Sequence, residues 1–134
     1  MVDPVVLYVD DEPMSREVME ILITQLLGYE HLTLFEDSRD IMPRIEALEP
    51  RPTLIFLDIQ MRPYSGFDVL RMLRDHPDFA DVMVVAVTAS VMSEEVLMLK
   101  SHSFDGCIGK PIDPRKFPIF MQRILAHETV WQVT

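Results

Sequence analysis

Cysteine and basic residues are scarce in this sequence, and each shortage argues against a class of protein. The single cysteine, Cys107, cannot pair within the chain, which favours a reducing compartment over a secreted, disulfide-bonded protein. Only 12 lysines and arginines stand against 22 aspartates and glutamates. The resulting net charge of −10 argues against nucleic acid as a direct partner, because neutralising phosphates requires clustered basic side chains.

Long apolar runs are also missing. No stretch approaches the roughly 20 apolar residues that a membrane-spanning helix needs. The N-terminal residues carry no basic segment of the kind that opens a signal peptide. We therefore expect a cytoplasmic protein that does not bind membranes.

The chain does have the composition of one folded domain. Its 134 residues are 49% hydrophobic and 25% charged, as in ordinary globular proteins. We expect one domain over residues 1–127, followed by a short C-terminal tail over residues 128–134. Trp131 in this tail either folds back onto the surface or mediates a contact, and Cys107 is expected to be an inert residue of the core.

Short apolar runs alternate with segments of helical period along the chain. The apolar runs predict buried strands at residues 5–9, 31–35, 53–57, 82–87 and 104–108. Helices are expected to begin at Pro13, at Asp37 or Ser38, after Ser65, at Ser93 and at Asp113. Pro43 predicts a kink or a late start of the second helix, and Pro118 predicts an irregular first turn of the fifth. This alternation indicates an α/β fold with a parallel sheet covered by helices on both faces.

Ionisable and hydroxyl side chains mark the ends of these strands. Asp10 and Asp11 follow the first strand, Asp58 the third, Thr88 the fourth and Lys110 the fifth. The carboxyl ends of parallel strands meet at one edge of a sheet, so we expect these residues to converge there. Three neighbouring carboxylates need a cation, and hard oxygen ligands select Mg²⁺ or a similar ion. With a lysine and a threonine nearby, the set suits a phosphoryl group placed on, or beside, an aspartate.

Five short motifs, taken together in order and spacing, make the sequence resemble the receiver domains of two-component response regulators. The motifs are YVDDEP (residues 8–13), FLDIQM (56–61), SGFDVL (65–70), VTAS (87–90) and GKPID (109–113). The resemblance runs from about Val5 to Leu125. It implies that residues 1–127 are a receiver domain with a flavodoxin-like, five-stranded parallel sheet in the order 2-1-3-4-5.

The resemblance also implies roles for the acidic residues. Asp58 resembles the aspartate that accepts the phosphoryl group. Asp11 resembles a direct metal ligand, and Asp10 resembles the acid that holds the metal through water. Gln60 is similar in position to a residue whose backbone carbonyl is a ligand. The implied cofactor is Mg²⁺ or Mn²⁺.

Further roles follow for the residues beside the acids. Thr88 resembles the switch hydroxyl that moves onto the phosphoryl group, and Ala89 resembles the small neighbour that keeps the site open. Lys110 resembles the phosphate-binding lysine. Its bond to Pro111 is similar to a peptide bond that is cis in the family.

Three features depart from the family pattern. Cys107 stands at the switch position where the family usually has an aromatic residue that turns inward on activation. Arg62 replaces a usual proline, with Pro63 one position later. The first helix is one residue longer than the commonest pattern. These departures bear on how the phosphorylated state is signalled, since none of them touches the residues of the phosphorylation chemistry.

The resemblance implies a signalling module rather than a conventional enzyme, one that catalyses its own phosphorylation and dephosphorylation. The donor would be a phosphohistidine of a sensor histidine kinase or a histidine phosphotransfer protein, and the output an unknown downstream protein. The implied donor surface comprises Met14, Ser15, Val18, Pro111 and Ile112. The fourth helix, fifth strand and fifth helix would form the output surface. The protein is expected to be a monomer or a dimer promoted by phosphorylation.

Three other functions were weighed on particular residues. Cys107 and Arg62 keep open a receiver-like scaffold that works without phosphorylation, although an intact acidic pocket argues against it. A small Mg²⁺-dependent phosphohydrolase with an aspartate nucleophile is disfavoured, because Gln60 stands where such enzymes carry a general acid. A flavoprotein is disfavoured because no phosphate-binding loop follows Val9.

Overall fold

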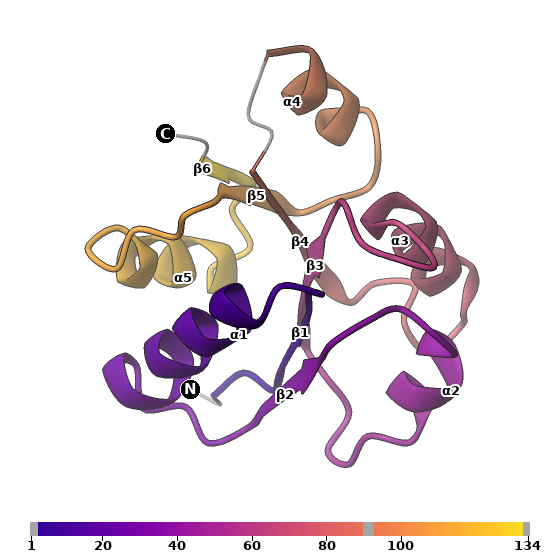
Figure 1. Cartoon of the computed structure of the whole chain (residues 1–134), viewed down its shortest axis with the longest axis horizontal. Helices are drawn as coiled ribbons and strands as arrows, with labels where there is room; N and C mark the ends of the chain where they lie inside the picture. Colours follow the sequence, from indigo (N-terminus) through magenta and orange to yellow (C-terminus); the bar gives the residue numbers. More distant parts are fainter. Residues whose placement is uncertain (1–2, 90–92, 133–134) are drawn as a thin grey trace.

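A parallel sheet runs through the middle of the computed structural model, which describes residues 3–89 and 93–132 (Figure 1). Its strands are β1 (Val6–Val9), β2 (Leu32–Phe35), β3 (Leu54–Asp58), β4 (Met83–Thr88), β5 (Gly106–Gly109) and β6 (Val130–Gln132). They pair in the order β2-β1-β3-β4-β5-β6, and every pair is parallel. The expected flavodoxin-like order 2-1-3-4-5 is confirmed, with one strand added at an edge. Ser90 of the VTAS motif and residues 133–134 of the expected tail lie outside the described residues.

Helices cover both faces of the sheet. They are α1 (Pro13–Glu20) with its continuation η1 (Ile21–Leu26), α2 (Ile41–Glu46), α3 (Gly66–Asp75), α4 (Ser93–Lys100) and α5 (Phe117–Leu125). The helices α1 and α5 lie on one face, and α2 and α3 lie on the other (Figure 1). None of the helices in the described part of the chain combines the length and apolar character that crossing a bilayer requires.

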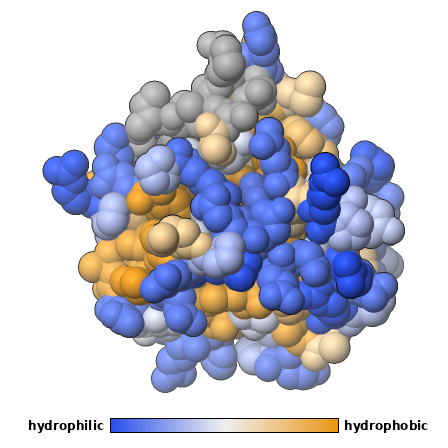
Figure 2. Space-filling model, in the orientation of Figure 1, coloured by the Kyte–Doolittle hydropathy of each residue, from blue (hydrophilic) through white to orange (hydrophobic). Residues whose placement is uncertain are grey.

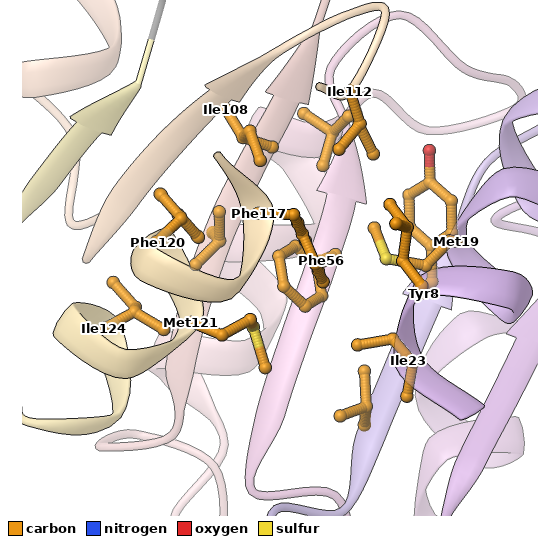
Figure 3. Close-up of a cluster of buried hydrophobic side chains, with 14 of the residues drawn as sticks. Tyr8, Met19, Ile23, Phe56, Ile108, Ile112, Phe117, Phe120, Met121 and Ile124 are labelled. Carbon is orange, nitrogen blue, oxygen red and sulfur yellow. The ribbon is translucent and has the colours of Figure 1, made fainter. Parts of the chain in front are cut away.

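The continuous apolar runs are explained by two separate cores. Successive side chains of a strand point to opposite faces, so Val6 and Tyr8 of β1 join the cluster under α1 and α5, whereas Leu7 and Val9 join the cluster under α2 and α3. Figure 3 shows the first cluster, in which side chains of α5 and α1 meet over Phe56 of β3. A strand with helices on both of its faces buries the side chains of both faces, so its sequence does not alternate between apolar and polar residues.

The first helix ends in a π-helical segment. The N–H of Leu27 donates to the carbonyl of Leu22 at 3.0 Å, five residues back instead of four. A π-helical turn accommodates one extra residue, which matches the extra residue noted in the sequence. Gly28 then ends the segment with a φ of 72°, a backbone conformation that glycine adopts without strain.

The second and fifth helices begin later than at the capping residues expected, which agrees with the late start that Pro43 predicted and the irregular first turn that Pro118 predicted. The second helix begins only at Ile41, because the Ser38 hydroxyl bonds the backbone of Tyr64 in the next loop instead of capping a helix. The fifth begins at Phe117, with Pro118 in its first turn, after an irregular segment in which Asp113 accepts the N–H of Arg115. The expected start after Ser65 is confirmed by a reciprocal capping box with Asp68.

The C-terminal segment, expected to be a short tail, adds a sixth strand to the sheet that was not predicted from the sequence. Val130 is buried and pairs with Gly106, and Trp131 pairs with Cys107. The Trp131 ring packs against the core under α2 and α3, and the Lys100 ammonium lies 5.4 Å from the ring centroid. A strand of three residues is too short to show an alternating pattern in the sequence. Its stability comes from pairing with the edge of β5.

We predict that Gly106→Ala destabilises the protein by about 1–3 kcal/mol, the usual cost of overpacking a core. A Cβ atom there would stand 2.7 Å from the Val130 carbonyl oxygen and 3.0 Å from Cδ1 of Ile124. Urea unfolding measures the change. As a control, the substitution is repeated in a chain truncated after Glu128, where the Val130 oxygen is absent and the cost should be smaller. An unchanged unfolding midpoint in the full chain would show that β6 does not lie against Gly106.

We also predict that the Cys107 thiol is unreactive in the native protein. Its side chain is fully buried, and burial raises the pKa of the thiol from 9.0 to about 11, so that almost no nucleophilic thiolate is present at neutral pH. An aromatic disulfide reagent should label the native protein only at the rate of unfolding and the urea-unfolded protein at once. Rapid labelling of the native protein would contradict the buried placement.

Candidate functional site

The carboxyl edge of the sheet gathers the residues that the strand ends carry. Asp58 is the last residue of β3 and Thr88 the last of β4, while Asp10 directly follows β1. Register places Asp58 opposite Val87, next to Thr88, and the N–H of Lys110 donates to the Thr88 carbonyl at 2.8 Å. The strand pairing itself therefore brings these positions together.

Three carboxylates form the centre of the site. Asp10, Asp11 and Asp58 each offer an oxygen, and these oxygens lie within 4.8 Å of one another. Asp10 has no exposed surface and Asp58 has 5%, whereas Asp11 is exposed. A set of hard oxygen donors with one open side fits a divalent cation of the Mg²⁺ class, which binds a few carboxylates and keeps water on its remaining positions.

Lys110 contacts both of the buried carboxylates. Its ammonium lies 2.8 Å from Oδ2 of Asp10 and 3.6 Å from Oδ2 of Asp58. Burial opposes a charge on this lysine, but the hydrogen bond and the charge of Asp10 outweigh it, and the pKa of Lys110 lies above its usual value. The lysine therefore stays protonated and is shared between the two acids.

The single positive charge of Lys110 does not neutralise both buried carboxylates. Burial and the neighbouring charge of Asp10 raise the pKa of Asp58 from 3.8 to about 7, and Lys110 offsets only part of this rise. In the absence of further positive charge, Asp58 is therefore partly protonated near neutral pH. The site has an excess of negative charge that a cation would remove.

Asp10 is held from several sides. Its Oδ1 accepts the N–H of Glu12 at 2.9 Å, and its main-chain carbonyl accepts Nη1 of Arg16 at 2.7 Å. The Tyr8 hydroxyl donates to Oδ2, the oxygen that also contacts Lys110. Burial and the charge of Asp10 hold the pKa of Tyr8 well above its usual value, so the phenol remains a donor.

This role of Tyr8 was not predicted from the sequence, although the sequence contains a signal for it. Tyr8 and Asp10 are two residues apart at the end of a strand, so their side chains leave the backbone on the same side. Tyr8 is also the one residue of β1 with a polar side chain. A phenol in an otherwise aliphatic buried strand needs a hydrogen-bond partner, and the aspartate two residues later is within reach.

The loop after β3 carries Gln60 and is tied to the loop before α2. The N–H of Gln60 lies 3.4 Å from Oδ1 of Asp58, and the side chain of Gln60 is exposed. The buried Ser38 hydroxyl both donates to the Tyr64 carbonyl and accepts its N–H, each at 2.7 Å. This pair of bonds restrains the segment that follows Asp58.

The peptide bond between Lys110 and Pro111 is cis, as the resemblance implied. The bond between Arg62 and Pro63, at one of the departures from the family pattern, is cis as well.

The residues expected to receive a donor line one groove. Its volume is about 310 Å³, and it lies between α1 and the segment after β5. The expected residues on its wall are Met14, Ser15, Val18, Pro111 and Ile112. Glu12, Lys110 and the exposed Ala89 complete the lining, so the groove opens onto the acidic site. Figure 2 shows an apolar area over α1 and α5, at the left of the view.

A second cavity, of about 440 Å³, lies on the α4 side of Thr88 and was not anticipated from the sequence. Its wall comprises Ile59, Gln60, Ser65, Phe67, Thr88, Met98 and Leu99. Cys107, the expected switch position, lies instead inside the core under α2 and α3, in the same cluster as Leu99. Thr88 is thus in contact with a space bounded by α4.

Comparison with known proteins agrees with the motifs. The family model of the response regulator receiver domain matches residues 6–121. The polar-differentiation response regulator DivK of Brucella anthropi is 30% identical over 113 residues, which are 84% of this chain and 88% of that protein. Stress response regulator protein 1 of Scheffersomyces stipitis is 26% identical over 106 residues, which are 79% of this chain and 36% of that protein.

Solved structures share the fold. The receiver domain of the sensor histidine kinase PA1611 from Pseudomonas aeruginosa, with a magnesium ion coordinated in its active-site cleft, has a TM-score of 0.78 at 22% identity. The alignment covers 93% of this chain and 99% of that one. The Mn²⁺-bound form of response regulator Rcp1 has a TM-score of 0.73 at 21% identity, over 92% and 93% of the two chains.

These likenesses in structure, at such identities, concern the fold alone. The family model goes further, because it follows the sequence from the first residue of β1 into α5 and so spans every strand end that carries a residue of the site. The chain belongs to the response regulator receiver domain family of two-component signalling.

Proposed function

We propose that this protein is a phosphorylation-controlled signalling module that accepts a phosphoryl group on Asp58 from a phosphohistidine donor. The observation that carries the proposal is the meeting of three carboxylates with Lys110 at one edge of the sheet. The donor would belong to a sensor histidine kinase or a histidine phosphotransfer protein.

In this proposal Asp11, Asp58 and the backbone carbonyl of Gln60 hold Mg²⁺ or Mn²⁺ directly, and Asp10 holds it through water. A bound divalent ion neutralises the charge of the carboxylates and of the phosphoryl oxygens. The closeness of the three carboxylates supports this set. The ions named for PA1611 and Rcp1 are of the same class.

The transfer step uses the residues of this chain in separate roles. A carboxylate oxygen of Asp58 forms a bond to phosphorus while the bond between phosphorus and the donor's imidazole nitrogen breaks. The other ring nitrogen of the donor carries a proton, so that the electron pair of the broken bond stays on the ring and the donor leaves as neutral imidazole. Lys110 supplies a positive charge and Thr88 a hydroxyl to the phosphoryl oxygens. Attack of water on phosphorus later releases inorganic phosphate and restores the Asp58 carboxylate.

The groove of about 310 Å³ beside Lys110 is the proposed docking place of the donor. Its apolar wall, with Met14 66% exposed, offers surface to bury against a donor helix. Ala89 on its wall carries only a methyl group, which leaves the path to Asp58 open.

Signalling in this chain is proposed to pass through Thr88 to α4 without an aromatic switch. Cys107 is too small to replace the family's aromatic, and it is fully buried. The cavity of about 440 Å³ joins Thr88 to Met98 and Leu99 of α4. A movement of Thr88 toward a phosphoryl group changes the wall of this cavity, and α4 can respond by repacking.

We predict that Asp58→Asn abolishes phosphorylation and leaves the fold intact. The amide has almost the volume of the carboxylate but is no nucleophile at neutral pH. Intact mass after incubation with acetyl phosphate and Mg²⁺ should show a phosphorylated wild type and an unmodified variant, with equal far-ultraviolet circular dichroism. Asp81→Asn, at an exposed position away from the site, is the control and should label as the wild type. Labelling of Asp58→Asn at the wild-type rate would remove Asp58 from this role; an unlabelled wild type would favour the phosphorylation-independent scaffold.

We further predict that Mg²⁺ raises the melting temperature more at about pH 8 than at about pH 5.5. The pKa of Asp58 is raised on folding, so the metal-free folded state binds an extra proton between pH 3.8 and about 7 and loses stability as the pH rises through that range. The ion takes the place of this proton, so the stabilisation by Mg²⁺ is larger at a pH where Asp58 has already lost the proton. Calorimetry at millimolar Mg²⁺ tests this, with Asp58→Asn as the variant that should lose the pH dependence. Equal shifts at both pH values would contradict it.

A further inference from the structure

Tyr8 is a buried polar residue beside the site to which the proposed transfer assigns no part. Its side chain has no exposed surface, and its hydroxyl donates to Oδ2 of Asp10. Figure 3 shows the hydroxyl oxygen at the top of the core cluster, at the end where β1 runs toward the site. The phenol thus joins the core to the acidic centre.

The ring of Tyr8 is held firmly. Phe56 meets it edge to face, with the ring centroids 6.3 Å apart and an interplanar angle of 85°. Phe56 is in turn packed against Phe117 of α5 at 6.2 Å. Met19 of α1 belongs to the same cluster and lies beside Tyr8 in Figure 3. A ring confined in this way aims its hydroxyl in one direction.

The hydrogen bond completes the set of donors around Asp10. Oδ1 accepts from the Glu12 N–H at 2.9 Å, and Oδ2 accepts from Lys110 at 2.8 Å and from Tyr8. Lys110 also serves Asp58, but at the longer distance of 3.6 Å. In the described structure, therefore, Asp10 draws the lysine more strongly than Asp58 does.

We propose that Tyr8 is a positioning residue for phosphorylation. Its hydroxyl fixes the Asp10 carboxylate and gives Oδ2 a hydrogen-bond donor besides Lys110. Oδ2 then holds the lysine less strongly, so that Lys110 can turn to the phosphoryl group on Asp58. The proposal rests on the proposed function. Without the hydroxyl, Lys110 is the one side-chain donor left to Asp10 among the described residues, and the carboxylate is held less firmly. Phosphorylation then slows, and the ion held through Asp10 binds more weakly.

The test is Tyr8→Phe, which keeps the ring and its packing and removes one hydroxyl. We expect the phosphorylation rate by acetyl phosphate at saturating Mg²⁺ to fall about five- to tenfold, and the Mg²⁺ dissociation constant to rise severalfold, in line with the loss of one hydrogen bond to a charged group. Tyr29→Phe is the matched control: Tyr29 is half-buried against the same cluster and outside both the site and the donor groove. It should change neither quantity.

A double-mutant cycle with Asp10→Asn separates positioning from a general effect on the fold. If Tyr8 acts through Asp10, the hydroxyl should matter much less in the Asp10→Asn background, in both the rate and the Mg²⁺ affinity. Intact mass followed over hours keeps a low residual rate measurable.

The outcomes separate the two proposals. A Tyr8→Phe variant that matches Tyr29→Phe in both rate and Mg²⁺ affinity overturns the role of Tyr8 while the wild type still labels. The same loss in the wild-type and Asp10→Asn backgrounds also overturns it, because the effect would then not pass through Asp10. A wild type that takes up no phosphate overturns the proposed function, and the role of Tyr8 with it.

Discussion

The contact of Lys110 with Asp10 and Asp58 is the interaction on which the rest of the site depends. Two carboxylates with almost no exposed surface repel each other and have lost their hydration, and the lysine at 2.8 Å and 3.6 Å offsets only part of that cost. The remaining deficit appears as the raised pKa of Asp58, about 7. A site with this deficit favours any ligand that brings positive charge, which is the physical basis for the proposed divalent ion.

Two spaces lie on opposite sides of this charged centre. The groove along α1 reaches Lys110 and Ala89, and the cavity under α4 reaches Thr88 and Gln60. Lys110, which lines the groove, donates its backbone N–H at 2.8 Å to the carbonyl of Thr88, which lines the cavity. In the proposed function the donor of the phosphoryl group docks in the groove, and the response to phosphorylation takes place at the cavity under α4. The strand ends that carry the site lie between the two.

Cys107 and β6 lie together on the β5 side of the sheet. Cys107 fills a buried position where the family usually has an aromatic residue, and β6 pairs along the edge that β5 would otherwise expose. Lys100 of α4 lies over the ring of Trp131 in β6. The helix next to Thr88 is thus in contact with the last strand, so a displacement of α4 would alter the surroundings of Trp131.

The succession of strands and helices along the chain, and the positions of Asp10, Asp58 and Lys110, could be predicted from the sequence, because they depend on apolar runs, helical period and strand ends that a few neighbouring residues define. The order of the strands within the sheet was implied by the resemblance to receiver domains. The start of α2, the strand β6 and the partner of Tyr8 were decided by tertiary structure. Each depends on a contact between segments or side chains that no local pattern encodes: Ser38 with Tyr64, the edge of β5 with Val130, and a buried hydroxyl with a carboxylate already bound by Lys110. Short-range periodicity decides which elements form, whereas the packing of those elements decides which polar atoms meet.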